Sequence, residues 1–250
     1  MDRPKCIFCL TTDTSLYNTK EHIIPESLGS GDWAILSSGL FCDKCQNIFG
    51  SSIEQQALAT YPLSNFRTLF GIATKKGKAP WFSYWEGKLS SAGSVGVMSY
   101  EPNDFFKSAF ESGQKTITIF PAMPEKTDML LRTLLKIGLE TYAADSSTED
   151  DIFSEKFDAA RKYALTGVKN NPWFYIQHED IDKVNSYLKG IKYKDWNDNF
   201  FSDVYEKGEL IYLHLKLLYL DFITPLIDNV IPDKGMTENL KEPKERLIIV

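Results

Sequence analysis

The sequence predicts an α+β protein built from two parts, a small unit at residues 1–79 and a mixed sheet-and-helix region at residues 80–250. Three observations predict it. All four cysteines of the chain lie between residues 6 and 45. Apolar residues recur at helical spacing in several segments. From residue 80 onward, short aromatic or β-branched runs alternate with Gly, Ser and Pro, which is typical of strands joined by turns.

The composition is that of a folded chain without a membrane span. Of its 250 residues, 43% are apolar, which is enough for one large core or two ordinary ones. No apolar run reaches about 18 residues, and no hydrophobic stretch follows the first residues as in a signal peptide. We therefore expect a cytoplasmic protein that makes no membrane contact. The net charge of −6 argues against a broad basic surface that binds nucleic acid indiscriminately.

The acidity is uneven along the chain. Residues 1–78 contain eight basic and seven acidic side chains, a net charge of +1, which leaves −7 for the remainder. Basic residues gather near the end of this first part, at Arg67, Lys75, Lys76 and Lys78. They either meet a phosphate backbone or form the solvated rim of a loop, and the sequence leaves both interpretations open.

The first elements of the small unit are predicted to form a hairpin. Residues 17–24 end in β-branched side chains and stop at Pro25, which predicts a short strand with His22 near its end. Residues 28–32 are predicted to turn, and residues 33–36 to return as the second strand.

A helix is predicted after the last cysteine. Its apolar positions recur every fourth residue, at Phe49, Ile53 and Ala57. Asn47, Gly50 and Glu54 share a neighbouring face of that helix. Glu54 is interpreted either as a solvated position or as a carboxylate that supports a site at Asn47.

The cysteines form two CxxC pairs, Cys6 with Cys9 and Cys42 with Cys45. A CxxC pair places two thiolates on one tight turn, so two pairs supply the four ligands of a tetrahedral, structural Zn²⁺. Free buried thiols or a pair of disulfides are the alternatives. The pairing of all four cysteines and the lack of a signal peptide favour zinc.

The order of motifs in this stretch resembles the zinc-stapled HNH endonucleases of the ββα-metal superfamily. Glu21-His22-Ile23-Ile24-Pro25 lies between the cysteine pairs, and Gln46-Asn47 with a short amphipathic run follows the second pair. The resemblance covers roughly the first quarter of the chain. It implies that residues 1–79 form a zinc-bound ββα-metal (HNH) domain, and that such proteins often serve in bacterial antiviral defence.

The resemblance also implies roles for individual residues. His22 corresponds to the general base that deprotonates the attacking water, and Glu21 to a ligand of one catalytic cation, Mg²⁺ or Mn²⁺. The family usually has Asn or His directly after the last cysteine, where this chain has Gln46. The resemblance therefore points to the Gln46-Asn47 pair for the second ligand. Position favours Gln46, but we expect Asn47, one place later, because its shorter side chain loses fewer rotamers on binding.

One position of the family pattern has no clear counterpart. A middle Asn that usually helps to orient the histidine is missing, and only Asp32, Ser37 and Ser38 could replace it.

The region at residues 80–250 is predicted to mix strands and helices. Strands are predicted at residues 81–86, 95–100, 116–120 and 173–176, with two strands or one bent strand at residues 209–224. Helices are predicted at residues 126–144, 151–168 and 179–188. In the first of these helices Arg132 and Lys136 fall outside the apolar face. Residues 232–246 are predicted to be extended, and His178 and His214 to be structural.

The sequence thus favours an endonuclease that hydrolyses phosphodiester bonds in DNA, with double-stranded DNA as its partner. Residues 80–250 are expected to select or control the substrate without supplying the chemistry, through an oligomer interface, an activating protein partner or the exclusion of most DNA. The alternative is a zinc-stabilised module that binds nucleic acid or protein without catalysis.

Overall fold

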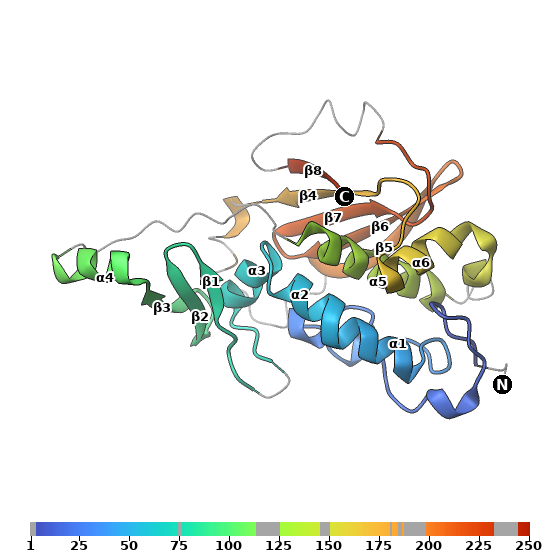
Figure 1. Ribbon diagram of the computed structural model, residues 1–250, viewed down its shortest axis with the longest axis horizontal. Helices are drawn as coiled ribbons and strands as arrows, with labels where there is room; N and C mark the ends of the chain where they lie inside the picture. The colour runs from blue at the N-terminus through green and yellow to red at the C-terminus, as the bar shows by residue number, and fades with distance from the viewer. Residues whose placement is uncertain are drawn as a thin grey trace.

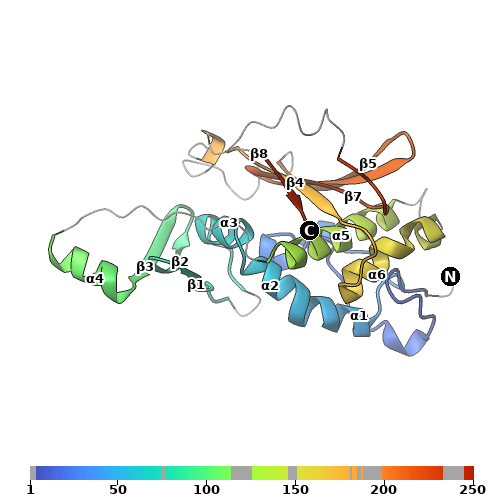
Figure 2. The same ribbon diagram turned by 45° about the horizontal axis from the view of Figure 1, so that its top comes forward.

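The computed structural model describes residues 4–74, 77–113, 126–145, 151–180, 182–184, 187, 199–232 and 245–250. Its main body has three layers (Figure 1). The helices of the N-terminal unit form one outer layer, a five-stranded sheet forms the other, and two helices lie between them. A small sheet and one more helix project from the side of this body, as the turned view in Figure 2 also shows. The predicted α+β class is confirmed.

One continuous helical segment dominates the N-terminal unit. Its three parts are α1 (Asp43–Ile48), the π-helical turn η4 (Phe49–Ile53) and α2 (Glu54–Leu58), and α3 (Leu63–Phe70) follows. The helix predicted after Cys45 is confirmed, although it begins at Asp43, before that cysteine. Its apolar stripe is buried, with Phe49, Ile53 and Ala57 at most 1% exposed.

The predicted hairpin is wrong in its extent. Residues 17–24 and 33–36 meet through a single antiparallel bridge between His22 and Ile35. Single 3₁₀ turns take up much of the rest: η1 (Thr14–Leu16), η2 (Glu26–Leu28) and η3 (Asp32–Ala34). Pro25 has no N–H to extend a ladder, and Gly29 at φ 96° turns the chain immediately after η2.

The small sheet consists of β1 (Phe82–Tyr84), β2 (Gly87–Ser94) and β3 (Val97–Pro102), paired in that order and antiparallel. The strands predicted at residues 81–86 and 95–100 correspond to β1 and β3. β2 was not predicted, because its Gly- and Ser-rich sequence has no β-branched residue. Helix α4 (Asp104–Glu111) follows, and its cap Asn103 accepts a hydrogen bond from the Phe106 N–H at 3.0 Å. The strand predicted at residues 116–120 lies outside the described residues.

The middle layer contains α5 (Thr127–Ala144) and α6 (Asp158–Thr166). The prediction of α5 is confirmed. The helix predicted at residues 151–168 is confirmed in part, because its beginning forms the 3₁₀ turns η5 (Asp151–Phe153) and η6 (Glu155–Phe157) and Gly167 ends it at φ 75°.

The large sheet is antiparallel throughout, with strand order β5-β6-β7-β4-β8. Its strands are β4 (Phe174–Glu179), β5 (Phe200–Lys207), β6 (Leu210–Leu217), β7 (Leu220–Pro225) and β8 (Glu245–Ile249). The two-strand reading of residues 209–224 is confirmed by β6 and β7. The helix predicted from residue 179 is wrong at its start, because Glu179 ends β4. The predicted extended tail lies mostly outside the described residues, and its last two residues begin β8.

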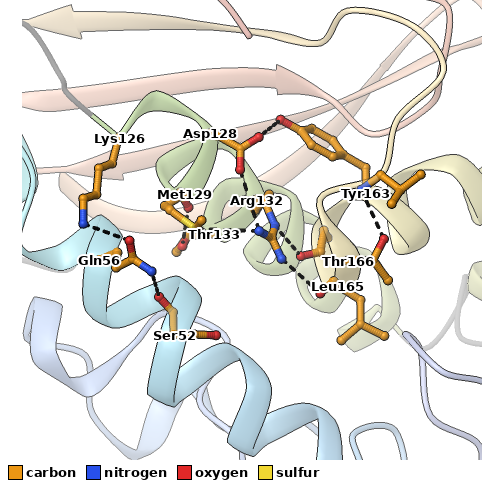
Figure 3. Close-up of polar contacts among 12 residues, drawn as sticks. Ser52, Gln56, Lys126, Asp128, Met129, Arg132, Thr133, Tyr163, Leu165 and Thr166 are labelled. Carbon is orange, nitrogen blue, oxygen red and sulfur yellow. Dashed lines mark hydrogen bonds and ion pairs between the residues drawn. The ribbon is translucent and has the colours of Figure 1, made fainter.

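Helix α5 touches both outer layers. On the sheet side, Gly138 permits close approach, since a Cβ there would lie 2.4 Å from Leu226 Cδ2 and 3.1 Å from Leu213 Cβ. On the other side, Lys126 Nζ donates to Gln56 Oε1 of α2 at 2.8 Å (Figure 3). The prediction that Arg132 and Lys136 lie outside the buried face is wrong: they are 8% and 0% exposed, because α5 is covered on all sides.

The hydrophobic core continues across residue 79. One cluster of buried side chains includes Phe49 of the N-terminal unit, Leu134 of α5 and Phe222 of β7. Tyr61 extends this connection by donating a hydrogen bond to Glu179 of β4 at 2.5 Å. The division of the chain at residue 79 stays a prediction. Among the described helices, none has the length and apolar character needed to cross a membrane.

Candidate active site and zinc site

The four cysteine sulfurs come together at one end of the N-terminal unit. They all lie within 4.8 Å of one another, with Cys9 exposed and the other three cysteines buried. A hydrogen bond from Cys45 lowers the pKa of the Cys6 thiol to about 5, whereas burial raises the pKa of Cys42 to about 11 and the hydrogen bond to Cys6 raises that of Cys45. Four converging sulfurs fit a structural Zn²⁺. The cysteine part of the predicted metal site is therefore supported by geometry.

Helix α1 fixes the segment that leads to the candidate catalytic residues. The Asp43 carboxylate accepts hydrogen bonds from the backbone N–H groups of Asn18 and Thr19, both at 3.1 Å, and from the Thr19 hydroxyl at 2.6 Å. One turn along, Gln46 Nε2 donates to the Lys20 carbonyl at 2.8 Å. Because Asp43 and Gln46 flank Cys45, the second cysteine pair and the segment that leads to Glu21 are parts of one local structure.

The backbone around His22 is held from the other side by residues 34–36. The Ile23 N–H donates to the Ala34 carbonyl at 2.8 Å, and the Leu36 N–H donates to the Glu21 carbonyl at 3.0 Å. Successive side chains point to opposite faces in extended backbone. This pairing therefore fixes the directions of the Glu21 and His22 side chains.

A pocket of about 790 Å³ opens beside these residues. Glu21, His22 and Gln46 line it together with two side chains from the following helical segment, Asn47 and Glu54. The π-helical turn η4 separates Asn47 from Glu54, and such turns occur frequently at functional sites. The predicted catalytic residues are thus gathered at one pocket.

Lys136 of α5 enters this site from the other half of the chain. Its Nζ lies 2.6 Å from Glu21 Oε1, 3.0 Å from Glu54 Oε1 and 3.1 Å from Glu140 Oε2, and it donates to the His22 carbonyl at 3.3 Å. The sequence did not predict this lysine at the site. The sequence pattern places Lys136 outside the apolar face of the predicted helix, where a charged residue is expected to be solvated. Lys136 also belongs to no short motif that would have marked it.

Burial and charge act together in this cluster. Burial by itself would lower the pKa of Lys136, but the charges of the neighbouring glutamates outweigh it and raise that pKa well above its usual range. Burial also raises the pKa of Glu140 well above its usual range, against the opposing effect of Lys136. Lys136 is therefore a permanent cation at neutral pH, and it neutralises charge behind Glu21 and Glu54.

His22 has a carboxylate beside it that the sequence did not indicate. Its Nε2 lies 3.5 Å from Glu26 Oε1, and the His22 side chain is 15% exposed. A nearby carboxylate stabilises the imidazolium that forms when a histidine takes a proton. No sequence signal marked Glu26, because four-residue spacing brings side chains together in a helix and His22 lies in extended backbone.

Part of the chain matches the model of a known protein family. Residues 6–62 match the model of a family described as HNH endonuclease. Residues 6–62 are therefore similar to an HNH endonuclease domain, and we refer to them as the HNH segment. Neither the curated proteins nor the solved structures that we compared with the chain gave a match.

The HNH segment contains both cysteine pairs and all four residues proposed for catalysis, His22, Glu21, Asn47 and Gln46. The Gln46 side-chain amide donates a hydrogen bond to the Lys20 carbonyl. The exposed Asn47 side chain has no hydrogen-bond partner within the described residues. Glu54 is 15% exposed and ion-paired, which excludes its reading as a solvated position.

Residues outside the pocket complete the comparison with the sequence analysis. None of the candidates for the missing Asn, Asp32, Ser37 and Ser38, lines it. His178 lies 3.1 Å from Glu245 across neighbouring strands, and His214 lies 2.9 Å from Asp221. Both histidines belong to the large sheet, in agreement with their predicted structural role.

Proposed function

We propose that this chain is a metal-dependent endonuclease that hydrolyses phosphodiester bonds in double-stranded DNA. The observation that carries the proposal is that Glu21, His22 and Asn47, all within the HNH segment, line one pocket. Hydrolysis requires a base for water and stabilisation of the charge that develops on the phosphate. The side chains around the pocket can supply the first of these directly.

In this proposal His22 takes the proton from the attacking water. Glu26 beside Nε2 stabilises the resulting imidazolium. The bridge to Ile35 and the hydrogen bond from Lys136 to the His22 carbonyl keep the histidine backbone in place. His22 is accordingly the proposed catalytic base, and Lys136 is a positioning residue.

The oxygens of Glu21 and Asn47 are the donors proposed for a divalent cation. A carboxylate and an amide suit the hard ions Mg²⁺ and Mn²⁺, whereas the thiolates of the other site suit zinc. When bound, such an ion neutralises charge on the scissile phosphate and on the leaving oxygen. Within the described residues, the cysteine cluster is the one group of three or more His, Cys, Asp or Glu side chains close enough to hold a metal. The proposed ion therefore depends on water and substrate oxygens for its remaining ligands.

A second candidate function is favoured by one contact. Glu21 is 10% exposed and already lies 2.6 Å from the Lys136 ammonium, which could occupy the place of a metal cation. A site neutralised in this way fits a zinc-stabilised module that binds nucleic acid or protein without cleaving it.

Plasmid cleavage with Mg²⁺ or Mn²⁺ separates the two functions. We expect the wild-type chain to nick or cut plasmid DNA, and His22→Ala to lose about 10²- to 10⁴-fold in rate, because a general base contributes to rate and not to folding. Zinc content and melting temperature should be the same in both proteins. Equal cleavage by the variant would exclude His22 as the base, and a wild-type chain that binds DNA without cutting it would favour the second function.

A further inference from the structure

Arg67 is a buried guanidinium on the wall of the same pocket. It lies on α3, after the end of the HNH segment, and is 5% exposed. Its guanidinium carbon lies 5.4 Å from the centre of the Phe82 ring, which holds the side chain in place. Arg67 and Phe82 line the pocket together with His22, Asn47 and the half-exposed ring of Trp81.

The side-chain nitrogens of Arg67 form no hydrogen bond or ion pair in the part of the chain that the structure describes. Its Nε is buried without a hydrogen bond, and no carboxylate forms an ion pair with it. The other buried arginines are different. Arg132 donates to the carbonyls of Ala164 and Leu165, both at 3.0 Å (Figure 3), and Arg161 donates to the carbonyl of Ile152 at 2.5 Å.

A buried charge without a partner is costly, and natural proteins rarely retain one without a reason. Burial lowers the pKa of Arg67 to about 10, so the side chain still carries its charge at neutral pH. The missing partner is therefore an anion that enters the pocket. The planar fork of donors on a guanidinium matches the oxygens of a phosphate better than any other common anion except a carboxylate.

We propose that Arg67 binds a backbone phosphate of the nucleic-acid strand that occupies this pocket. This inference rests on the proposed function, because it takes the ligand from the substrate of the same site. Two features favour a nucleic acid over a free phosphate: the candidate catalytic residues line the same cavity, and Trp81 offers an exposed aromatic face of the kind on which bases stack. Of the two described basic residues in the stretch at residues 67–78, Lys78 is exposed and Arg67 is buried without an ion pair, which singles out Arg67.

The first experiment measures DNA binding by the His22→Ala protein without added divalent cation. Arg67→Met keeps much of the side-chain volume and removes the charge, and Lys88→Met is the control because Lys88 is exposed on β2 and does not line the pocket. We expect Arg67→Met to weaken binding of a short duplex about tenfold. We also expect it to reduce the slope of log K against log salt by about 0.9, the loss of one phosphate contact. An unchanged slope, or an equal effect of Lys88→Met, would overturn the proposal.

The second experiment asks which source of phosphate the site takes. Inorganic phosphate, compared with chloride at equal ionic strength, should raise the melting temperature of the parent protein by about 2–4 °C and leave that of Arg67→Met unchanged. Without phosphate, Arg67→Met should melt no lower than its parent, because it removes an unpaired buried charge. A large drop in melting temperature would instead make Arg67 structural. A phosphate effect together with an unchanged DNA slope would assign the site to free phosphate and overturn the assignment to substrate.

These outcomes are distinguishable from a failure of the proposed function. If the wild-type chain binds DNA through Arg67 but does not cut it, the endonuclease proposal fails and the phosphate site stands. If the wild-type chain cuts DNA and Arg67→Met keeps full binding and slope, the phosphate site fails alone.

Discussion

Gln46 and Asn47 are neighbours in the sequence but have different surroundings. The Gln46 amide holds the Lys20 carbonyl, whereas the Asn47 side chain is exposed at the pocket. We therefore expect Asn47→Ala to reduce cleavage and to raise the Mg²⁺ concentration needed for half-maximal rate. Gln46→Ala should cost about 1 kcal/mol of unfolding free energy and leave that concentration unchanged. Titration of the cleavage rate with Mg²⁺ tests this, and the opposite pattern would transfer the proposed ligand role to Gln46.

Glu140 gives the cluster around Lys136 a dependence on pH. Its pKa is raised in the folded state, so the folded chain retains a proton that the unfolded chain loses above about pH 4.5. The contribution of Glu140 to stability is therefore full below that pH and falls as pH rises toward the raised pKa. We expect Glu140→Gln to remove this loss, which amounts to at most about 1.4 kcal/mol per pH unit. Denaturant unfolding of both proteins between pH 5 and pH 8 measures it.

Lys136→Met is the matched variant. Whereas Glu140→Gln should raise the free energy of unfolding at neutral pH, Lys136→Met should lower it. It leaves Glu21 and Glu54 without their shared cation, and removal of one partner from a buried ion pair costs about 3–5 kcal/mol. A Lys136→Met protein as stable as wild type would mean that Glu21 and Glu54 do not need the Lys136 ammonium to remain largely buried.

Sequence patterns singled out those residues of the proposed sites that belong to short motifs. The cysteine pairs and the Glu21-His22 dipeptide were found because their spacing reflects local chemistry. Lys136 and Glu140 could not be found in this way, since they reach Glu21 only after α5 packs against the N-terminal unit. Arg67 was noted for its charge alone, because neither its burial nor its lack of a partner can be read from a linear pattern.

The second cysteine pair and helix α1 belong to the same element, so binding of a metal by these cysteines and folding of α1 depend on each other. Cys42 is the residue before the first turn of α1, and Cys45 lies within it. We expect one zinc per chain, and we expect Cys42→Ser to lose the metal and to unfold much of residues 6–62, because structural zinc supplies on the order of 10 kcal/mol to small units. Elemental analysis and hydrogen exchange of residues 6–62 measure the two effects. His22→Ala serves as the zinc-retaining control, and a wild-type protein purified without chelator that contains no zinc would refute the prediction.

The elements that sequence patterns predicted best are those with one buried face or strong alternation, such as β6 and β7. Helix α5 was located correctly, yet its buried charged positions were not, because periodicity assumes that a helix has a solvent side. The structure has only one bridge where strands were predicted at residues 17–24 and 33–36. The length of a short strand is decided by its pairing in three dimensions and not by local propensity.

At the scale of the whole molecule, the core joins the HNH segment to the rest of the chain. Phe49, Ile53 and Leu58 belong to the same buried cluster as Leu130 and Leu134 of α5. We therefore expect a fragment of residues 1–79, supplied with zinc, to expose this apolar surface and to lack a stable fold. Circular dichroism melting of the fragment tests this. A cooperative melt and cleavage that depends on His22 would restore the simpler view from the sequence, in which residues 80–250 only select the substrate.

The contact between Lys136 and His22 also sets an order of events during synthesis. The two residues are separated by 114 positions. At typical rates of about 5–20 residues per second, roughly 6 to 23 s pass on the ribosome between the synthesis of His22 and that of Lys136. Until α5 emerges, the carboxylates of Glu21 and Glu54 have no ammonium between them and the HNH segment has no cover for its apolar side. In the proposed endonuclease, the positioning residue Lys136 therefore reaches the site only after more than half of the polypeptide has been translated.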